Sequence, residues 1–409
     1  MKTAKKQKRW RPVINNKFLD MKKLIVIVAF CLPLSLMAQQ IRDVWAAVCE
    51  HNLTYKALQQ QAEAERAGLR VGLAPEDPEV EFAWLWGSPA SVGPRVDFSV
   101  TQSFDFPTSY VYRSRVARLR DSQTQLSCEV HRRELLLEVG KLYYGIVYQN
   151  ARIEDVRHCL QYLSEVSEAT QQKFNAGECN VFDFKRVRLA ELNMRQTLAQ
   201  AETELSVMLL EMKRLNGGEE LEISESIFPE IQLPPDFDVW YVFVECLHPG
   251  FQWWDMESRI SQEQIRVEKS GWALQLRAGY MREQVPSETF QGVKVGLSLP
   301  LWRNLNSVKQ SKLQNSAAML RMADEEFEFY NRLHAAYLHA AALQQQMADY
   351  QELLESVDAD ELLQKALASG QISLTDYLSE MSLYHESHER LLQMQYETAL
   401  QYLEMQVWE

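Results

Sequence analysis

Proline is absent from two long stretches of this chain of 409 residues, 108–228 and 301–409. Both stretches are rich in Leu, Glu, Gln, Ala, Arg and Met, which favour helix. A helix over 110–175 would be about 99 Å long at about 1.5 Å per residue, far longer than a globular domain is wide. Apolar residues in these stretches recur at near-heptad steps. The missing proline therefore predicts very long helices that pack beside equally long neighbours.

Cysteine patterns and catalytic motifs are also lacking. Five cysteines follow residue 38, at irregular spacing and without a C-x-x-C pair, so no disulfide framework is predicted. The sequence has no P-loop, nucleophile elbow, H-E-x-x-H motif or glycine-rich cofactor loop. We therefore expect neither an enzyme nor a bound cofactor.

The segment "HESHE" at 385–389 is the best metal-like cluster in the sequence. His385 and His388 are three residues apart and could share a helical face. Zinc needs three or four ligands in fixed geometry, and the sequence does not indicate the others. We expect a solvated helical face here and no metal site.

The N-terminus is basic, but the remainder of the chain is acidic. A mostly apolar run, 24–36, follows Met21-Lys22-Lys23 and is too short to span a membrane. Residues 1–38 are predicted to be an extension and a secretory signal peptide, with translation starting at Met1 or Met21. They carry nine Lys and Arg and one Asp, a net charge of +8, which leaves −13 − 8 = −21 for the mature chain. Such a charge excludes nucleic acid as a natural partner and favours cations or basic partners.

Two similar phrases, "AGECNVFDF" at 176–184 and "SGQISLTDY" at 369–377, stand 193 residues apart. Each has a glycine, a cap residue three positions later and an aspartate three beyond that: Gly177, Asn180 and Asp183, then Gly370, Ser373 and Asp376. A glycine in the left-handed conformation ends a helix, and an Asn or Ser followed by an acid starts the next one. Both phrases, 177–183 and 370–376, are therefore predicted to be tips of helical hairpins.

Four segments, 79–86, 95–106, 272–282 and 293–302, alternate between apolar and polar residues, which predicts strands. Their lengths, 8 to 12 residues, are close to the roughly 9–11 residues that suit one tilted crossing of a bilayer. We predict that one face meets lipid, with Val80, Phe82, Trp84, Val96, Phe98, Val100, Leu274, Leu276, Val295 and Leu297. The opposite face, with Asp97, Ser99, Gln275 and Lys294, would meet water.

The strand pairs end at Pro107 and Pro300, again 193 residues apart, so the mature chain is predicted to be an internal duplication. Repeat 1 covers 39–215, a linker 216–235 and repeat 2 236–409, and each repeat has the order helix, two strands, long helical hairpin. Four strands cannot close a barrel, and open edges cannot lie in lipid. Three copies would provide twelve strands, so a trimer is expected.

The duplicated pattern resembles the TolC family of outer-membrane efflux channels. The resemblance rests on the signal segment, the prolines, the two tips and "GLSLPLW" at 296–302. It implies a mixed α+β membrane protein: a homotrimer with a twelve-stranded barrel in the lipid of the outer membrane and a helical tunnel through the periplasm. It also implies a periplasmic adaptor and an inner-membrane pump as partners, with this chain as the passive exit duct for drugs, metal ions or other small molecules.

The resemblance assigns roles to the tips. Asp376 and Asp183 would line the periplasmic aperture, and Gly177, Asn180, Gly370 and Ser373 would belong to the surface that docks the adaptor. Well-known members lock the aperture with a Tyr and an Arg at the positions of Leu367 and Ile372, so that latch is not expected here. The alternative is a soluble periplasmic coiled-coil adaptor or scaffold, although an adaptor would normally have a single helical hairpin. The sequence identifies neither the exported substrate nor the class of pump.

Overall fold

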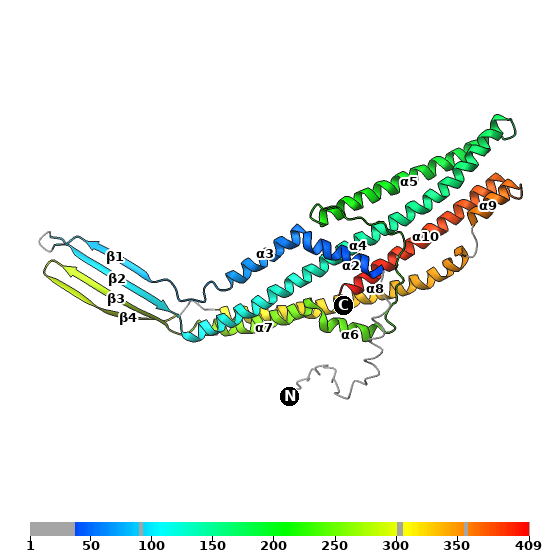
Figure 1. The fold of residues 1–409 in the computed structure, drawn as a ribbon. Helices are drawn as coiled ribbons and strands as arrows, with labels where there is room; N and C mark the ends of the chain where they lie inside the picture. The colour runs from blue at the N-terminus through cyan, green and yellow to red at the C-terminus, as the bar shows by residue number, and fades with distance from the viewer. Residues whose placement is uncertain (1–36, 90–92, 301–305, 356–358, 409) are drawn as a thin grey trace, which may run out of the picture.

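The chain forms an elongated molecule with a sheet at one end and two helical tips at the other (Figure 1). The structure, a computed structural model, describes residues 37–89, 93–300, 306–355 and 359–408. Repeat 1 contains α2 (Met37–His51), α3 (Leu53–Gly68), β1 (Glu79–Leu85), β2 (Arg95–Phe104), α4 (Pro107–Asn175) and α5 (Val181–Leu215). Repeat 2 contains α6 (Phe237–Leu247), α7 (Pro249–Ser270), β3 (Gln275–Val285), β4 (Glu288–Ser298), α8 (Ser307–Glu355), α9 (Ala359–Ala368) and α10 (Leu374–Gln406). The predicted signal segment lies outside the described residues except at its end.

The sheet is antiparallel throughout, with the order β1-β2-β3-β4. The central strands, β2 and β3, come from different repeats and pair with each other, so the two repeats together form a single sheet. β1 and β4 each pair on one side only among the described strands. The sheet therefore has two open edges.

Two of the predicted strand ranges are wrong by several residues. β3 starts at Gln275 and not at 272, because the end of α7 continues as turns up to the Ala273 N–H, which bonds to the Ser270 carbonyl. β4 starts at Glu288 and not at 293, because only two residues separate it from Val285, its partner on β3. β4 also ends at Ser298, and 301–302 of the predicted strand lie outside the described residues. β1 and β2 end one and two residues earlier than predicted.

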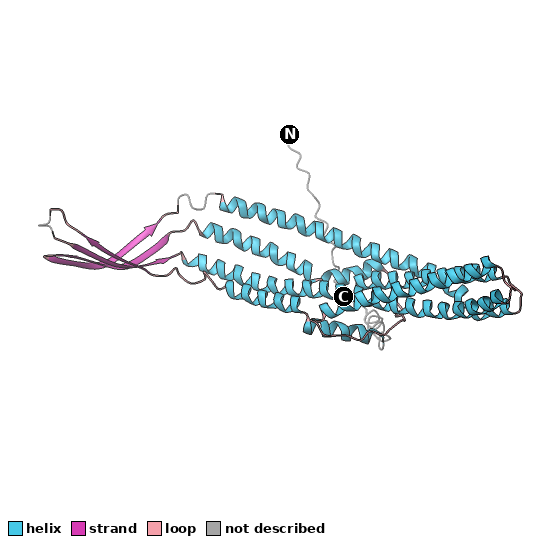
Figure 2. Ribbon diagram, turned by 90° about the horizontal axis from the view of Figure 1, so that it is seen from above, coloured by secondary structure: helices cyan, strands magenta, loops and turns pink. Residues whose placement is uncertain are grey.

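The helices lie side by side along the long axis of the molecule (Figures 1 and 2). α4, with 69 residues, is about 104 Å long. Near the sheet the packing order is α3-α4-α7-α8, and towards the tips it is α5-α4-α10-α8. Thus α4 and α8 extend through both halves, and none of the described helices is both long and apolar enough to cross a membrane.

The helical segment that opens each repeat is interrupted, between α2 and α3 in repeat 1 and between α6 and α7 in repeat 2. The side chain of Asn52 caps α3 by accepting from the Tyr55 N–H. His248 caps α7 in the same way, through its Nδ1 and the N–H groups of Gly250 and Phe251. Each break bends the chain where it passes the middle of the bundle.

The main core lies in this middle region. It combines residues of α2, α4, α6, α8 and α10, including Val48, Val139, Ile146, Leu333 and Leu403. The linker 216–235 packs on it: Asn150 of α4 donates to the Ile223 and Glu225 carbonyls, and Gln344 of α8 donates to the Ile231 carbonyl. A second, smaller core lies near the tips. The two cores hold the helical layer together at its centre and at its far end.

Candidate functional site

The two hairpin tips have the same backbone geometry. Gly177 has φ of 74° and Gly370 has φ of 72°, the left-handed region that favours glycine. At each tip the glycine N–H and the next N–H bond back to the last helical turn, to the carbonyls of Phe174 and Lys173 and to those of Leu367 and Ala366. The predicted helix stops are confirmed.

The predicted caps are also confirmed at both tips. Asn180 Oδ1 accepts from the Phe182 and Asp183 N–H groups at 2.9 Å, which starts α5. Ser373 and Asp376 form a reciprocal capping box at the start of α10, in which the Ser373 hydroxyl oxygen accepts from the Asp376 N–H at 3.2 Å and the Asp376 carboxylate accepts from the Ser373 N–H at 3.3 Å. Both aspartates therefore have a local role that one chain provides by itself. Asp376 remains exposed at the end of the molecule.

Leu367 and Ile372, which occupy the positions of the Tyr and Arg latch of well-known TolC family members, lie in an apolar environment. Leu367 and Ile372 pack against the tip core, which contains Leu163, Val187 and the fully buried Tyr377. Between the two tips, Arg186 of α5 donates to the Thr375 hydroxyl at 2.8 Å. Among the described residues of one chain, the two hairpins are thus joined near their tips by apolar packing and by polar contacts such as those of Arg186 with Thr375 and of Gln364 with Glu165.

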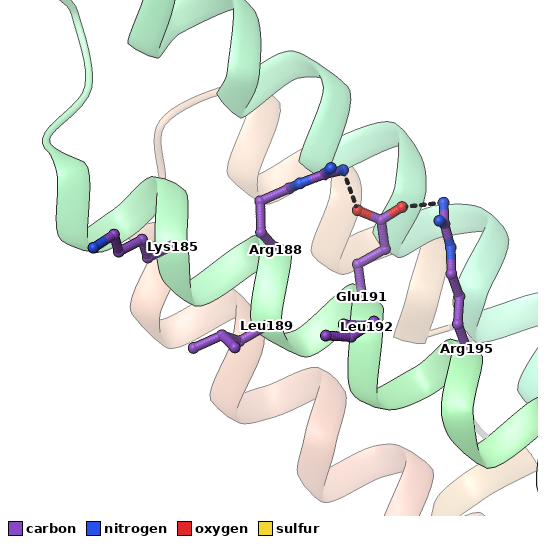
Figure 3. Close-up of a pocket in the computed structure, with 6 residues that line it drawn as sticks. All are labelled: Lys185, Arg188, Leu189, Glu191, Leu192 and Arg195. Atoms are coloured by element: carbon purple, nitrogen blue, oxygen red, sulfur yellow. Dashed lines mark hydrogen bonds and ion pairs between the residues drawn. The ribbon is translucent and has the colours of Figure 1, made fainter.

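A buried carboxylate below the first tip was not predicted. Figure 3 shows Glu191 of α5 between Arg188 and Arg195, which both pair with it. The Ser167 hydroxyl of α4 donates to the same carboxylate at 2.7 Å. These three partners satisfy a carboxylate that has almost no exposure, and the Ser167 contact fixes α5 on α4.

Glu191 and its two arginines line an open pocket of about 350 Å³, together with Lys185, Leu189 and Leu192 (Figure 3). Leu189 and Leu192 are exposed on the outer side of α5. Val207 and Leu210 are exposed too, each eighteen residues further on, which is five helical turns and so the same face. The pocket therefore lies at one of two apolar patches on the same face of α5, with exposed polar residues such as Gln196 and Gln200 between them.

The strand register shows which side chains share a face. Directly paired residues of an antiparallel sheet point to the same side. Pairs on one face are Val80 with Val100, Phe82 with Phe98, Trp84 with Val96, Leu276 with Leu297, and Ala278 with Val295. The predicted apolar residues within the strands thus lie on one face, and most of their side chains are exposed, Val295 by 73%. Leu274 directly precedes β3 and is outside the strand.

The apolar face changes character along the strands. Its rows farthest from the helices contain Arg282 beside Phe98 and Gln284 beside Val96. Their β4 partners, Gln291 and Thr289, are polar as well. These polar side chains interrupt the alternation in the sequence, which explains why the fourth strand was predicted to start only at 293.

The opposite face of the sheet is mostly polar, although Leu85, Met281 and Phe290 also lie on it. Asp97, Ser99 and Lys294 lie on it, as predicted. Arg95 pairs there with the Asp97 carboxylate at 2.9 Å and with Glu283 of the neighbouring strand at 3.0 Å. The two faces of the sheet therefore suit two different environments.

The prediction of a solvated face for "HESHE" is wrong for both histidines. The side chains of His385 and Asp155 are only 14% and 16% exposed, and His385 Nδ1 lies 2.9 Å from Asp155 Oδ2. His388 Nδ1 lies 2.9 Å from the other oxygen of the same carboxylate. Burial alone would raise the pKa of Asp155, but hydrogen bonds from the two histidines outweigh it and lower the pKa to about 2. The hydrogen bond to Asp155 raises the pKa of His385.

The chain is similar to known proteins in structure but not in sequence. No protein-family model matches the chain, and no curated relative matches it. Among solved structures, CusC, studied for transmembrane channel formation, superposes with a TM-score of 0.76 over 90% of this chain and 92% of its own, at 14% identity. The CmeC outer membrane channel of Campylobacter jejuni gives 0.75 over 90% and 85%, also at 14% identity. The open-state MtrE outer membrane channel of Neisseria gonorrhoeae gives 0.70 over 90% and 88%, at 13% identity.

At these identities the shared property is the fold. The chain has the fold of an outer-membrane channel subunit, with long helical hairpins that continue from a four-stranded sheet. The long helical hairpins and the four-stranded sheet implied by the sequence resemblance to the TolC family are thereby confirmed.

Proposed function

We propose that this protein is the outer-membrane exit duct of a tripartite efflux or export system, a passive conduit and not an enzyme. One observation carries the proposal: a sheet with one exposed apolar face and one polar face continues directly into helices about 100 Å long. An apolar outer face and a polar inner face are what a barrel in lipid requires. The channels that share the fold favour this function over the soluble adaptor or scaffold.

A homotrimer follows from the edges of the sheet. The open edges β1 and β4 carry unpaired backbone groups that are costly in lipid. If β4 of one copy pairs with β1 of the next, three copies close the sheet with twelve strands. The apolar face would then meet the lipid of the outer membrane.

The helical layer supports the same assembly. In the half near the tips its edges are α5 and α8. α5 carries the exposed apolar residues described above, and in the same half α8 carries the exposed Leu338 and Leu353. Three more exposed residues of α8, Leu313, Leu320 and Phe327, are seven residues apart on one helical face in the half near the sheet, where α8 is also an edge of the layer. We infer that α5 of one copy packs on α8 of the next and completes a periplasmic tunnel.

The tips would be the periplasmic end of that tunnel. If three copies converge there, three exposed Asp376 carboxylates form a ring in the passage, with Asp183 nearby. Rings of acidic side chains select cations. The turns around Gly177, Asn180, Gly370 and Ser373 would face a periplasmic adaptor, and an inner-membrane pump would supply energy.

Fractionation and controlled labelling test the proposal. The full-length protein should be recovered with the outer membrane and should migrate as a trimer in mild detergent. In cells, a water-soluble thiol reagent should label Asp97→Cys and leave Phe98→Cys protected, since adjacent residues of β2 face opposite sides. Recovery as a soluble periplasmic monomer, or equal labelling at the two positions, would overturn the proposal.

A further inference from the structure

A cluster of four potential metal ligands connects the two repeats inside the helical bundle. Asp155 and Cys159 lie one turn apart on α4, and His385 and His388 lie one turn apart on α10. The ligand atoms of Asp155, Cys159 and His385 are all within 4.8 Å of one another. His388 reaches the same carboxylate at 2.9 Å. Spacings of three and four residues place each pair on one helical face, so the two faces meet.

We propose that Asp155, Cys159, His385 and His388 form a binding site for a divalent transition-metal cation, Zn²⁺ by the chemistry of its ligands. The inference does not depend on the proposed channel function.

The ligand types select the class of cation. Ca²⁺ and Mg²⁺ take oxygen ligands, whereas a set with one thiolate, two imidazoles and one carboxylate suits Zn²⁺. The set also resembles structural zinc sites in having four protein ligands, which leaves no open position for a reacting water.

The distances among Asp155, Cys159 and His385 fit a tetrahedral ion after a small adjustment, and His388, which contacts Asp155, would have to move closer to the other two ligands to complete the site. With Zn–S of about 2.3 Å and Zn–N of about 2.0–2.1 Å, the sulfur and nitrogen ligands stand about 3.6 Å apart. Cys159 Sγ and His385 Nδ1 are 3.7 Å apart. The 2.9 Å contact between His385 and Asp155 would have to open by about half an ångström, since two ligand atoms at about 2.1 Å from the ion are separated by about 3.4 Å.

The surroundings restrict the position of these ligands. Cys159 is only 3% exposed, so its sulfur cannot turn to solvent. One turn before Asp155, Arg152 pairs with Glu389 of α10 at 3.0 Å and with Glu204 of α5 at 3.4 Å. These pairs align α4 with α10 and α5 around the cluster. A bound ion would cross-link α4 to α10 and so fix the second hairpin on the first.

Cobalt is the probe for the experiment, because a thiolate bound to Co²⁺ gives a charge-transfer band in the near ultraviolet. The metal-free full-length protein, with the exposed Cys246 replaced by Ser, is titrated with Co²⁺ and then with Zn²⁺. We expect one Co²⁺ per chain with that band, and its displacement by Zn²⁺. Cys159→Ser should abolish the band. His385→Gln and His388→Gln should each weaken binding by at least tenfold, the lower limit for mutations that merely surround a metal site.

A matched control and a folding check accompany the variants. His158→Gln changes a histidine of α4 that packs on Tyr162 and is not part of the cluster, so it should leave the affinity unchanged. Circular dichroism verifies the helix content of each variant. If Cys159→Ser does not fold, His388→Gln still tests the site, because His388 is more exposed and the fold tolerates its substitution. Absence of Co²⁺ binding to the parent protein, or equal affinity in the parent and His388→Gln, would overturn the proposal.

Discussion

His248 should make the stability of the protein depend on pH in the range where the ordinary imidazole begins to gain a proton. Its Nδ1 accepts the N–H groups of Gly250 and Phe251 at 3.1 and 3.3 Å, which a protonated ring could not do. Burial lowers the pKa of His248 to about 4, with Arg133 and Arg332 contributing in the same direction. The ring also packs among Phe251, Phe329 and Trp408. The folded protein therefore retains the neutral histidine.

The sign and the size of the effect follow from the two pKa values. Above the ordinary value of 6.5, His248 is neutral in both the folded and the unfolded chain. As the pH falls below 6.5, the unfolded chain binds a proton that the folded protein does not, and stability is lost at about 1.4 kcal/mol per pH unit. The loss ends near pH 4 at about 3 kcal/mol, and at about pH 5 it amounts to about 2 kcal/mol for each chain.

The variant His248→Asn separates this effect from other titrations. Asparagine also caps a helix with its side-chain oxygen, but it does not titrate. The free energy of unfolding is measured for both proteins in mild detergent, by urea unfolding followed by circular dichroism, between about pH 7 and pH 5. The wild type should lose about 2 kcal/mol more than the variant over that range. Parallel pH profiles would show that His248 gains its proton equally in the folded and unfolded states and would refute the reasoning.

Three further predictions concern the aperture, the sheet and the assembly. In planar-bilayer recordings, Asp376→Asn should reduce cation preference and block by divalent cations; unchanged selectivity in an intact trimer would leave Asp376 with the capping role alone. Val295→Arg should destabilise the protein by about 2–4 kcal/mol if its face meets lipid near midplane, whereas Lys294→Arg on the opposite face should be neutral in the same unfolding assay. Leu320→Glu should dissociate the trimer on native gels, since burial of a leucine is worth about 1.5–3 kcal/mol, whereas Gln314→Glu should not; a stable Leu320→Glu trimer would place the interface elsewhere.

The tips and the strand faces could be predicted because their determinants are local. A left-handed glycine and a cap with an acid three residues on are contained within seven residues, and both copies formed as expected. The alternation of apolar and polar residues also predicts which side chains share a face of a strand, wherever one face is uniformly apolar. It failed at the beginning of β4, where Thr289 and Gln291 occupy the otherwise apolar face and pair with Gln284 and Arg282. The hairpin there is defined by pairing with β3, which the alternation of one segment does not reveal.

The buried polar groups could not be predicted because their partners are distant in the sequence. His385 and His388 showed half of a cluster, but Asp155 and Cys159 precede them by more than two hundred residues. Only the packing of α10 on α4 makes the four side chains neighbours. Glu191 is similar: its sequence context is that of an exposed helix, and the Ser167 hydroxyl of another helix identifies it as buried. The sequence nevertheless contained one indication of the cluster. Asp155 and Cys159 are four residues apart, which is the spacing that places two ligands on the same face of a helix.

The sheet and the helical layer both have exposed edges, and the duplication arranges both of them in the same way. Each half of the chain provides two strands and a helical hairpin, and joining the halves makes a four-stranded sheet and a four-helix layer. In the sheet the inner pair, β2 and β3, joins the repeats, and so does the inner pair of helices near the tips, α4 and α10. The outer members, β1 with β4 and α5 with α8, are left with unpaired backbone or exposed apolar residues. Because the strands continue into the helices, an assembly that closes the sheet brings together the helical edges as well, so a substitution on α8 such as Leu320→Glu should also weaken the barrel.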